Sequence, residues 1–366
     1  MKTKKIFVAL MVAALCLPFL NSCKTDTPDA PDAPDITIGT GVCVLNAGKF
    51  QSNNSSITYY DFKAGFASGD IFLDKNNRGL GDTGEDMVKY GSKIYISVYK
   101  SSILEVIDAK TAKSIKSIPL TNADGTARSP RTLTTANGKV YIVLYDGHVT
   151  SLDTTSLTLG SIIAVGPNPD ASVIANNKLY VANTGGMANP KYDKTVSVID
   201  LTKFQEIKKI EVNLNPQAID ADSKGNIFVI SNGNYADIPG KFQRIEVGTE
   251  KVTDVDVIKN AKGITTEGDK VYLYTFDYDA NWQAVNKKIT VYDAASNKII
   301  TDNILKTEVI KTPYCIDIDP VSKDIYLGVT DYKNNGKMYC FKNDGTYKFD
   351  FTVGINPCKT VFIYNK

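Results

Sequence analysis

The chain has 366 residues, with 42 basic and 40 acidic side chains and a formal charge of +2, so binding to nucleic acid by bulk charge is excluded. Its single histidine, His148, and its six cysteines form no pattern typical of a zinc site, and one histidine leaves little room for histidine-based catalysis. A composition with 20 Tyr, 14 Phe and 26 Gly is typical of a folded protein rich in strands and turns. We therefore expect a protein that is not an enzyme, with no metal site and no catalytic cofactor.

Residues 1–22 have the pattern of an export signal. Lys2, Lys4 and Lys5 are followed by the apolar residues 6–20, which are too few to span a bilayer as a helix of about 20 residues. The run ends in Leu20-Asn21-Ser22-Cys23, which resembles a bacterial lipobox. We expect Cys23 to be lipidated; the alternative is a secretory signal that is cut at another position.

Residues 23–36 are predicted to be the lipid-attachment cysteine and a flexible acidic linker. Prolines alternate with acidic residues from Pro28 to Asp35, and such a stretch forms neither helix nor sheet. Lys24 and the acids that follow it resemble the signal that sends Gram-negative lipoproteins to the cell surface. We therefore expect a lipid-anchored protein of the outer membrane, exposed on the cell surface.

From residue 37 onward the sequence repeats with a period of about 47 residues. The clearest marker is a strand that ends in a charged residue, found at Asp61, Asp108, Asp153, Asp200, Glu246, Asp293 and Lys342, with spacings of 47, 45, 47, 46, 47 and 49 residues. A second strand echoes this period at residues 94–99, 140–145, 179–184, 227–232, 271–276 and 325–330. The chain therefore contains seven repeat units.

Each unit predicts four strands separated by turns, without helical periodicity. Residues 37–366 are thus expected to form an all-β fold, a seven-bladed β-propeller with four antiparallel strands per blade. The first unit lacks its first strand, and residues 360–364 supply a strand of that kind, so we expect them to pair with residues 42–45 and close the ring. A solenoid is the alternative, but neither end has a polar cap.

The connections between strands differ in length on the two faces of the ring. One face has tight turns, such as Asn137-Gly138 and Asn176-Asn177. The other has long segments, expected to be loops, at 50–55, 76–85, 121–131, 183–195, 232–240, 275–288 and 330–337. Long loops on a rigid scaffold commonly carry function, so we place the binding site on the long-loop face.

These long loops are rich in aromatic and amide side chains, which suit a large, neutral, amphipathic ligand. The predicted ligand contacts are Tyr99, Tyr145, Asn183, Tyr192, Asn234, Tyr235, Tyr278, Trp282 and Tyr332. Arg131 follows a proline at the start of an inner strand and is predicted to lie at the mouth of the axial channel. The alternatives are that Asn and Tyr merely favour loops, and that Arg131 is bound to a neighbouring blade.

Other prominent residues are predicted to be structural. The acids that end the third strands recur too regularly for a ligand site, and we expect them to cap the following turn. His148 has no Ser or Cys partner at a catalytic spacing. Cys43, Cys315, Cys340 and Cys358 are expected to be buried thiols, because the repeat places no two of them opposite each other in one blade.

Several motifs resemble known propeller families. KLYVANTGG (178–186) and VSVID (196–200) are similar to YncE-type propellers with YVTN repeats. LNAGKFQSNNSSITYYD (45–61), LGDTGEDM (80–87) and SPRTL (129–133) resemble the BtuG family of surface lipoproteins, although Ala47 stands where that family more often has Glu. The resemblance covers the chain after residue 40.

The BtuG resemblance implies a function. It implies capture of cobalamin (vitamin B12) at the cell surface and transfer to a BtuB-like TonB-dependent outer-membrane transporter, with the corrinoid as ligand and not as catalytic cofactor. The alternatives are a glycan-binding or a protein-interaction propeller in a surface nutrient-uptake system. An enzyme would need clustered carboxylates, and the only dense loop acids are Asp277, Asp279 and Asp331.

Overall fold

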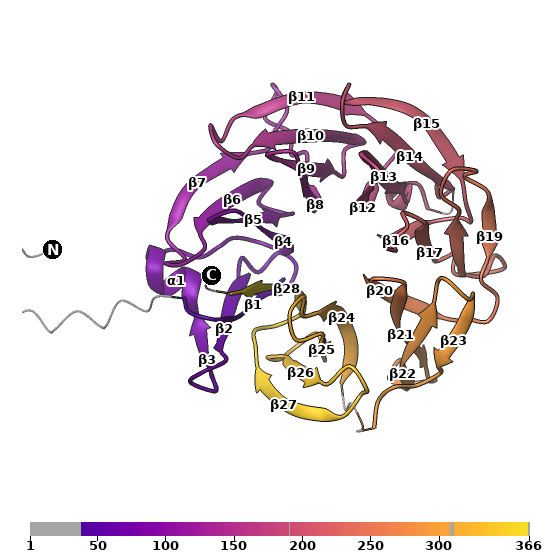
Figure 1. The fold of residues 1–366 in the computed structure, drawn as a ribbon. Helices are drawn as coiled ribbons and strands as arrows, with labels where there is room; N and C mark the ends of the chain where they lie inside the picture. The colour runs from indigo at the N-terminus through magenta and orange to yellow at the C-terminus, as the bar shows by residue number, and fades with distance from the viewer. Residues whose placement is uncertain (1–37, 190, 307, 309–310, 365–366) are drawn as a thin grey trace, which may run out of the picture. The chain divides into compact units, whose positions relative to one another are not determined.

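The computed structural model describes residues 38–189, 191–306, 308 and 311–364. The predicted signal peptide, Cys23 and the linker lie outside the described residues. Residues 38–364 form seven four-stranded antiparallel sheets that surround a central axis as the blades of a propeller (Figure 1). The predicted fold class is therefore confirmed.

Each blade has an inner strand, two middle strands and an outer strand. From blade 1 to blade 7, the inner strands are β28 (Pro357–Ile363), β4 (Gly84–Tyr90), β8 (Pro130–Ala136), β12 (Pro169–Ala175), β16 (Pro216–Ala221), β20 (Ala261–Glu267) and β24 (Thr312–Ile318). The second strands are β1 (Gly41–Asn46), β5 (Lys93–Val98), β9 (Lys139–Leu144), β13 (Lys178–Asn183), β17 (Ile227–Ser231), β21 (Lys270–Tyr278) and β25 (Ile325–Thr330). The third strands are β2 (Ser56–Asp61), β6 (Ile103–Asp108), β10 (His148–Asp153), β14 (Thr195–Asp200), β18 (Lys241–Ile245), β22 (Ala284–Asp293) and β26 (Lys337–Phe341). The outer strands are β3 (Phe66–Asp70), β7 (Ser114–Pro119), β11 (Leu159–Ala164), β15 (Gln205–Glu211), β19 (Val252–Asp254), β23 (Lys298–Thr301) and β27 (Tyr347–Thr352).

The ring closes through the C-terminal strand, as the sequence predicts. In the register of β28 and β1, Phe362 lies opposite Val42 and Thr360 lies opposite Val44. The seven inner strands contact one another in a complete cycle, in which β28 touches both β24 and β4. Closure thus joins the two ends of the folded chain in blade 1.

The hydrophobic core consists of seven clusters, one at each interface between adjacent blades in the described part of the chain. Successive side chains of a strand point to opposite faces, so each blade contributes to two clusters. In β1, Cys43 and Leu45 pack against blade 2, while Val42 and Val44 pack against blade 7. The alternating apolar pattern in the sequence is therefore the pattern of a sheet covered on both faces.

The charged ends of the third strands cap turns, which confirms their predicted structural role. The Asp61 carboxylate accepts hydrogen bonds from the backbone N–H groups of Lys63 and Ala64, at 2.8 Å each. The same arrangement recurs at Asp108, Asp153, Asp200 and Asp293. These five acids set the turn that leads to the outer strand in blades 1, 2, 3, 4 and 6, whereas Glu246 in blade 5 accepts from the Thr249 hydroxyl and blade 7 has Lys342 at this position.

Two local features differ from the sequence-based prediction. A short helix, α1 (Ile71–Asn76), follows β3, and Asp70 caps it by accepting from the N–H groups of Phe72 and Leu73. Six residues are too few to show helical periodicity, so the pattern could not reveal it. The segment 275–288 was expected to be one long loop, but β21 continues to Tyr278 and β22 begins at Ala284, so most of it is a hairpin.

The four cysteines of the folded part, Cys43, Cys315, Cys340 and Cys358, are all free thiols; the first three are buried and Cys358 is half-buried. A one-turn 3-10 helix at Gly186–Ala188 lies between β13 and β14. Over the residues that the structure describes, no helix has the length and apolar character needed to cross a membrane.

Candidate functional site

Seven residues form a ring at the long-loop end of the axial channel. In every blade, the pairing between the inner strand and the second strand shifts near the start of the inner strand. The shift leaves one or two inner-strand residues unpaired. The residues that this shift leaves unpaired all line the axial cavity, and a β-bulge of this kind commonly redirects a side chain. We call the first of them in each blade the bulge ring: Cys358, Glu85, Arg131, Asp170, Gln217, Lys262 and Tyr314, in order from blade 1 to blade 7.

The axial cavity has a volume of about 430 Å³, which lies within the range of small-molecule sites. Below the bulge ring it is lined by Asp86, Asp220, Asp317 and Lys359. Lys359 donates to Asp317 over 2.5 Å. Burial lowers the pKa of Lys359, but Asp317, Asp86 and Asp220 together hold it above its ordinary value, so this lysine stays charged.

The three carboxylates below the ring also join neighbouring blades. Asp86 of blade 2 accepts from the N–H of Leu133 in blade 3 over 2.7 Å, and Asp220 of blade 5 accepts from the N–H of Thr266 in blade 6 over 2.8 Å. These carboxylates therefore stabilise the ring and are occupied by protein donors.

Arg131 lies in the bulge ring as predicted, and its charge is bound by neighbouring blades. Its guanidinium contacts the Glu85 carboxylate at 2.9 Å and the Asp170 carboxylate at 2.5 Å. It also lies over the rings of Tyr99 and Tyr145, at 5.0 and 5.4 Å from their centroids. The structure thus favours the alternative in which Arg131 is bound to neighbouring blades, here through the carboxylates of Glu85 and Asp170.

Glu85 is an unusual member of this cluster. Burial raises the pKa of its carboxyl to about 7; Arg131 acts in the opposite direction, and Asp170 and Asp86 add to the rise. Glu85 therefore changes its charge near neutral pH, within contact of Arg131.

A continuous set of aromatic rings leads from the channel to the outer rim across blades 6 and 7. We call it the aromatic ledge; it comprises Tyr274, Phe276, Tyr278, Trp282, Tyr314 and Tyr332. Its inner members Tyr274 and Tyr314 line the axial cavity, and the Tyr274 hydroxyl donates to the Tyr314 carbonyl over 2.8 Å.

The outer members of the ledge extend from these two tyrosines. Tyr314 contacts Tyr332 edge to face at 5.9 Å, and the Tyr332 side chain lies near that of Tyr278. Tyr278 in turn contacts Trp282 at 5.8 Å. The ledge therefore connects the channel mouth with the most exposed aromatic side chain of the rim.

Several rim aromatics are exposed and held in an uncommon backbone conformation. The exposed fractions are 79% for Trp282, 69% for Tyr235 and 45% for Tyr332. Their φ angles are 59°, 59° and 63°, in the left-handed region that residues other than glycine seldom adopt. Exposed apolar rings held at a local backbone cost are typical of binding sites.

Two of the predicted ligand contacts use their side chains within the protein, and one of them, Asn183, is fully buried. Asn183 has no exposed surface: its amide nitrogen donates to Thr195 and Ser197 at 2.9 Å each, and its oxygen accepts from the N–H of Gly166. Asn234 donates to Asp237 and accepts from the N–H groups of Ala236 and Ile238, so it shapes the loop that presents Tyr235. Burial removes Asn183 from the predicted contacts, whereas Asn234 is partly exposed and stays a predicted contact.

The remaining predicted residues form three aromatic groups around the rim. Tyr99 and Tyr145 are in contact at 5.9 Å, next to Arg131. Tyr192 and Tyr235 are in contact at 6.1 Å on blades 4 and 5. The third group is the ledge, which contains Tyr278, Trp282 and Tyr332. Of the ledge residues that the sequence did not indicate, Tyr274 and Phe276 are also buried members of the core between blades 6 and 7, at 8% and 6% exposed, whereas Tyr314 is half-buried.

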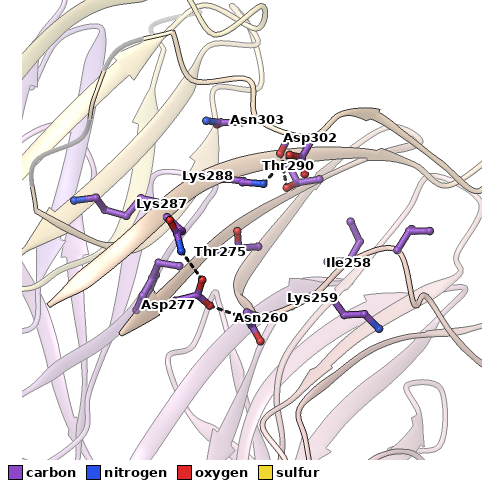
Figure 2. A pocket seen from close by; sticks show the side chains of 13 residues that line it. Ile258, Lys259, Asn260, Thr275, Asp277, Lys287, Lys288, Thr290, Asp302 and Asn303 are labelled. Carbon is purple, nitrogen blue, oxygen red and sulfur yellow. Dashed lines mark hydrogen bonds and ion pairs between the residues drawn. The ribbon is translucent and has the colours of Figure 1, made fainter. Parts of the chain in front are cut away.

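A larger cavity of about 620 Å³ lies off the axis, beside the β21–β22 hairpin (Figure 2). The Asp277 carboxylate accepts from the amides of Asn260 and Asn286, at 2.7 and 3.0 Å. On the other side of the cavity, Lys288 donates to the Asp302 side chain over 2.7 Å. The lining is polar. The Asp277 carboxylate is bound by two amides, and Lys288 and Asp302 neutralise each other.

The described residues contain no group of three or more His, Cys, Asp or Glu side chains arranged to hold a metal ion. His148 contacts Asp146 at 3.1 Å. It is the first residue of β10, a third strand, whereas the bulge ring lies on the inner strands.

Comparisons with solved structures support the fold alone. Residues of the Kuenenia stuttgartiensis hydrazine synthase superpose with a TM-score of 0.57 and 17% identity, over 70% of this chain and 76% of that one. The computationally designed Ika8 protein superposes with a TM-score of 0.57 and 13% identity, over 90% of this chain and 99% of that one. The dihydro-heme d1 dehydrogenase NirN in complex with DHE superposes with a TM-score of 0.57 and 13% identity, over 92% of this chain and 77% of that one.

No curated protein matches the sequence. One family model does match it, over residues 40–361, which is nearly the whole propeller. The chain therefore belongs to the family described as Domain of unknown function (DUF5074).

Proposed function

We propose that this propeller is a non-catalytic binding protein whose long-loop face captures a large, flat, amphipathic ligand. The observation that carries the proposal is the aromatic ledge, which runs from the axial cavity at Tyr314 to the exposed Trp282. Desolvated aromatic rings supply most of the binding energy at such surfaces. The rigid ring beneath them keeps the entropic cost of binding low.

We further propose that the ligand is a corrinoid of the cobalamin type. A corrin is a broad, nearly flat ring with amide groups at its edge, so its faces suit the ledge and its amides suit the tyrosine hydroxyls of the rim. The resemblance of residues 45–61, 80–87 and 129–133 to the BtuG family supports the same ligand.

The sequence of residues 1–36 supports the cellular part of this proposal. Lipid attached to Cys23 would hold the protein at the outer membrane, and the acidic linker would let the propeller move above it. In this account the partner is a BtuB-like TonB-dependent transporter, which receives the corrinoid from the propeller.

A direct binding experiment tests the ligand. Purified residues 24–366 are mixed with cyanocobalamin and passed over a size-exclusion column while visible absorbance is followed. Coelution of the corrin band with the protein is the expected result. Elution of all corrin at the small-molecule volume, with folded protein, would contradict the proposal.

The off-axis cavity favours a glycan as the second candidate. Its amides and carboxylates from Asn260, Asp277, Asn286 and Asp302 are suited to sugar hydroxyls, and the exposed Trp282 belongs to the same hairpin. Titration with soluble oligosaccharides, monitored by calorimetry, distinguishes the two: heat from an oligosaccharide but none from cyanocobalamin would favour the glycan.

A further inference from the structure

The bulge ring has two chemically different halves. In one half, Glu85, Arg131 and Asp170 bind one another, so their charges are largely satisfied inside the protein. The other half contains Gln217, Lys262 and Tyr314, on the consecutive inner strands β16, β20 and β24. In the second half, side-chain donors remain without an acceptor among the described residues.

Each of these three residues has a donor that is not used among the described residues. The Lys262 ammonium is exposed, lines the axial cavity and makes no ion pair or hydrogen bond with a described residue. The Gln217 side-chain oxygen accepts from Asn232, which leaves its NH₂ group without an acceptor among these residues. The Tyr314 hydroxyl likewise has no bond to a described residue, whereas its carbonyl accepts from Tyr274.

The backbone directs Lys262 toward the channel. Lys262 is the unpaired residue of the bulge between Ala261 and Gly263, so its side chain leaves the plane of the blade. A Cβ atom at Gly263 would lie 2.1 Å from the Tyr274 ring, which shows that this ring crosses the strand directly beside Lys262. The lysine is thus placed next to the inner end of the aromatic ledge.

We propose that Gln217, Lys262 and Tyr314 form an anion-recognition site that receives a phosphate ester of the ligand. One cationic and two neutral donors, all facing one cavity, match the acceptor oxygens of a phosphate. The inference rests on the proposed function, because in a cobalamin the phosphate is carried beside a flat corrin ring. The corrin would then lie on the ledge while its phosphate enters the channel mouth at Lys262.

The opposite half of the ring adds specificity. Glu85 and Asp170 flank Arg131, so that half carries two carboxylates for one guanidinium and repels a phosphate when Glu85 is ionised. A ligand with one anionic group is therefore oriented in a single way across the mouth. A neutral corrin without phosphate lacks this constraint.

The test compares two ligands that differ only in the phosphate: dicyanocobinamide and dicyanocobinamide phosphate. Affinities are measured by calorimetry for the mature chain, for Lys262→Gln and for the control Lys270→Gln, an exposed lysine at the other end of the same β20–β21 hairpin. We expect the unsubstituted chain and the control to prefer the phosphate form by about tenfold or more. In Lys262→Gln that preference, the ratio of the two affinities, falls to about one.

An unchanged preference in Lys262→Gln, or no preference in the unsubstituted chain, would overturn the inference while leaving corrinoid binding intact. If neither corrinoid binds, the proposed function fails, and a second measurement decides the anion site alone. Lysine acetylation is then followed by peptide mass spectrometry with and without methyl phosphate. If methyl phosphate slows the acetylation of Lys262 more than that of Lys270, the anion site is upheld. If it changes both acetylation rates equally, the anion site is refuted.

Discussion

Asp317 in β24 binds Thr360 in β28 twice: its carboxylate accepts from the Thr360 backbone N–H and from its hydroxyl, at 2.9 Å each. The closing strand is therefore fixed to blade 7 as well as to β1 of its own blade. Asp317 also binds Lys359, so one carboxylate serves two consecutive residues of the strand that completes the ring.

The substitution Asp317→Asn should reduce the free energy of unfolding by about 1–3 kcal/mol, because it removes the carboxylate in direct contact with Lys359 and weakens the acceptor of Thr360. The change is measured by urea denaturation. Glu211→Gln is the control, since Glu211 is exposed and pairs only with the exposed Lys194, an interaction worth about 0–1 kcal/mol. Equal stabilities of the two variants would contradict a role of Asp317 in closure.

The fold could be predicted from the sequence because its signals are periodic. The strand-ending acids from Asp61 to Asp293 mark the repeat, and the missing first strand of blade 1 points to residues 360–364 as its replacement. Helix α1 could not be predicted, since it depends on the local cap at Asp70 and not on periodicity.

The site could be predicted only in part. Arg131 stood out because it follows Pro130, and the same position in other blades would have identified Asp170, Gln217, Tyr314 and Cys358. Asn183 was misjudged because a loop-forming residue type was assumed to face solvent. The hydroxyls at Thr195 and Ser197 gave a signal for burial, and Asn46 repeats this arrangement with Ser56 and Thr58.

Glu85 should make stability depend on pH near neutrality. Its folded-state pKa, about 7, is above the ordinary value of 4.5, so the folded state holds the proton more tightly than the unfolded state. The resulting stabilisation is present at pH 5 and is lost as pH rises through 7. Glu85→Gln should therefore raise the melting temperature relative to the unsubstituted chain at pH 8 but hardly at pH 5.

Thermal unfolding at these two pH values provides the check. Asp124→Asn is a suitable control, because hydrogen bonds from Thr126 lower the pKa of this exposed carboxyl and its titration lies below both values. If Glu85→Gln changes the melting temperature by the same amount at pH 5 and at pH 8, Glu85 does not titrate in this range.

Gly263→Ala should disturb the inner end of the aromatic ledge. The added Cβ would lie 2.1 Å from the Tyr274 ring, so the ring must move and its bond to the Tyr314 carbonyl is strained. We expect a loss of about 1–3 kcal/mol in unfolding free energy, typical of overpacking. Gly69→Ala is the matched control, because nothing lies within 4 Å of its Cβ position. Unchanged stability of Gly263→Ala in urea denaturation would refute the close packing.

Cys23→Ala tests the lipid anchor. Without the thiol no diacylglycerol can be attached, so the protein should appear in the soluble fraction after cell fractionation, whereas the unsubstituted chain stays with the outer membrane. The alanine variant of Cys358, which lies in the folded part, serves as the control and should remain membrane-bound. Quantitative retention of Cys23→Ala in the outer membrane would refute anchoring at this residue.

The most direct test of ligand capture on the long-loop face uses Trp282, the single tryptophan of the chain, at the outer end of the ledge. Cyanocobalamin is titrated while Trp282 fluorescence is followed, with free N-acetyltryptophanamide correcting for light absorbed by the corrin. We predict strong quenching that saturates at one ligand per chain. In Tyr278→Ala the same titration should give a lower affinity for cyanocobalamin. Absence of binding, or binding seen by calorimetry without a change in Trp282 fluorescence, would contradict capture on the aromatic ledge.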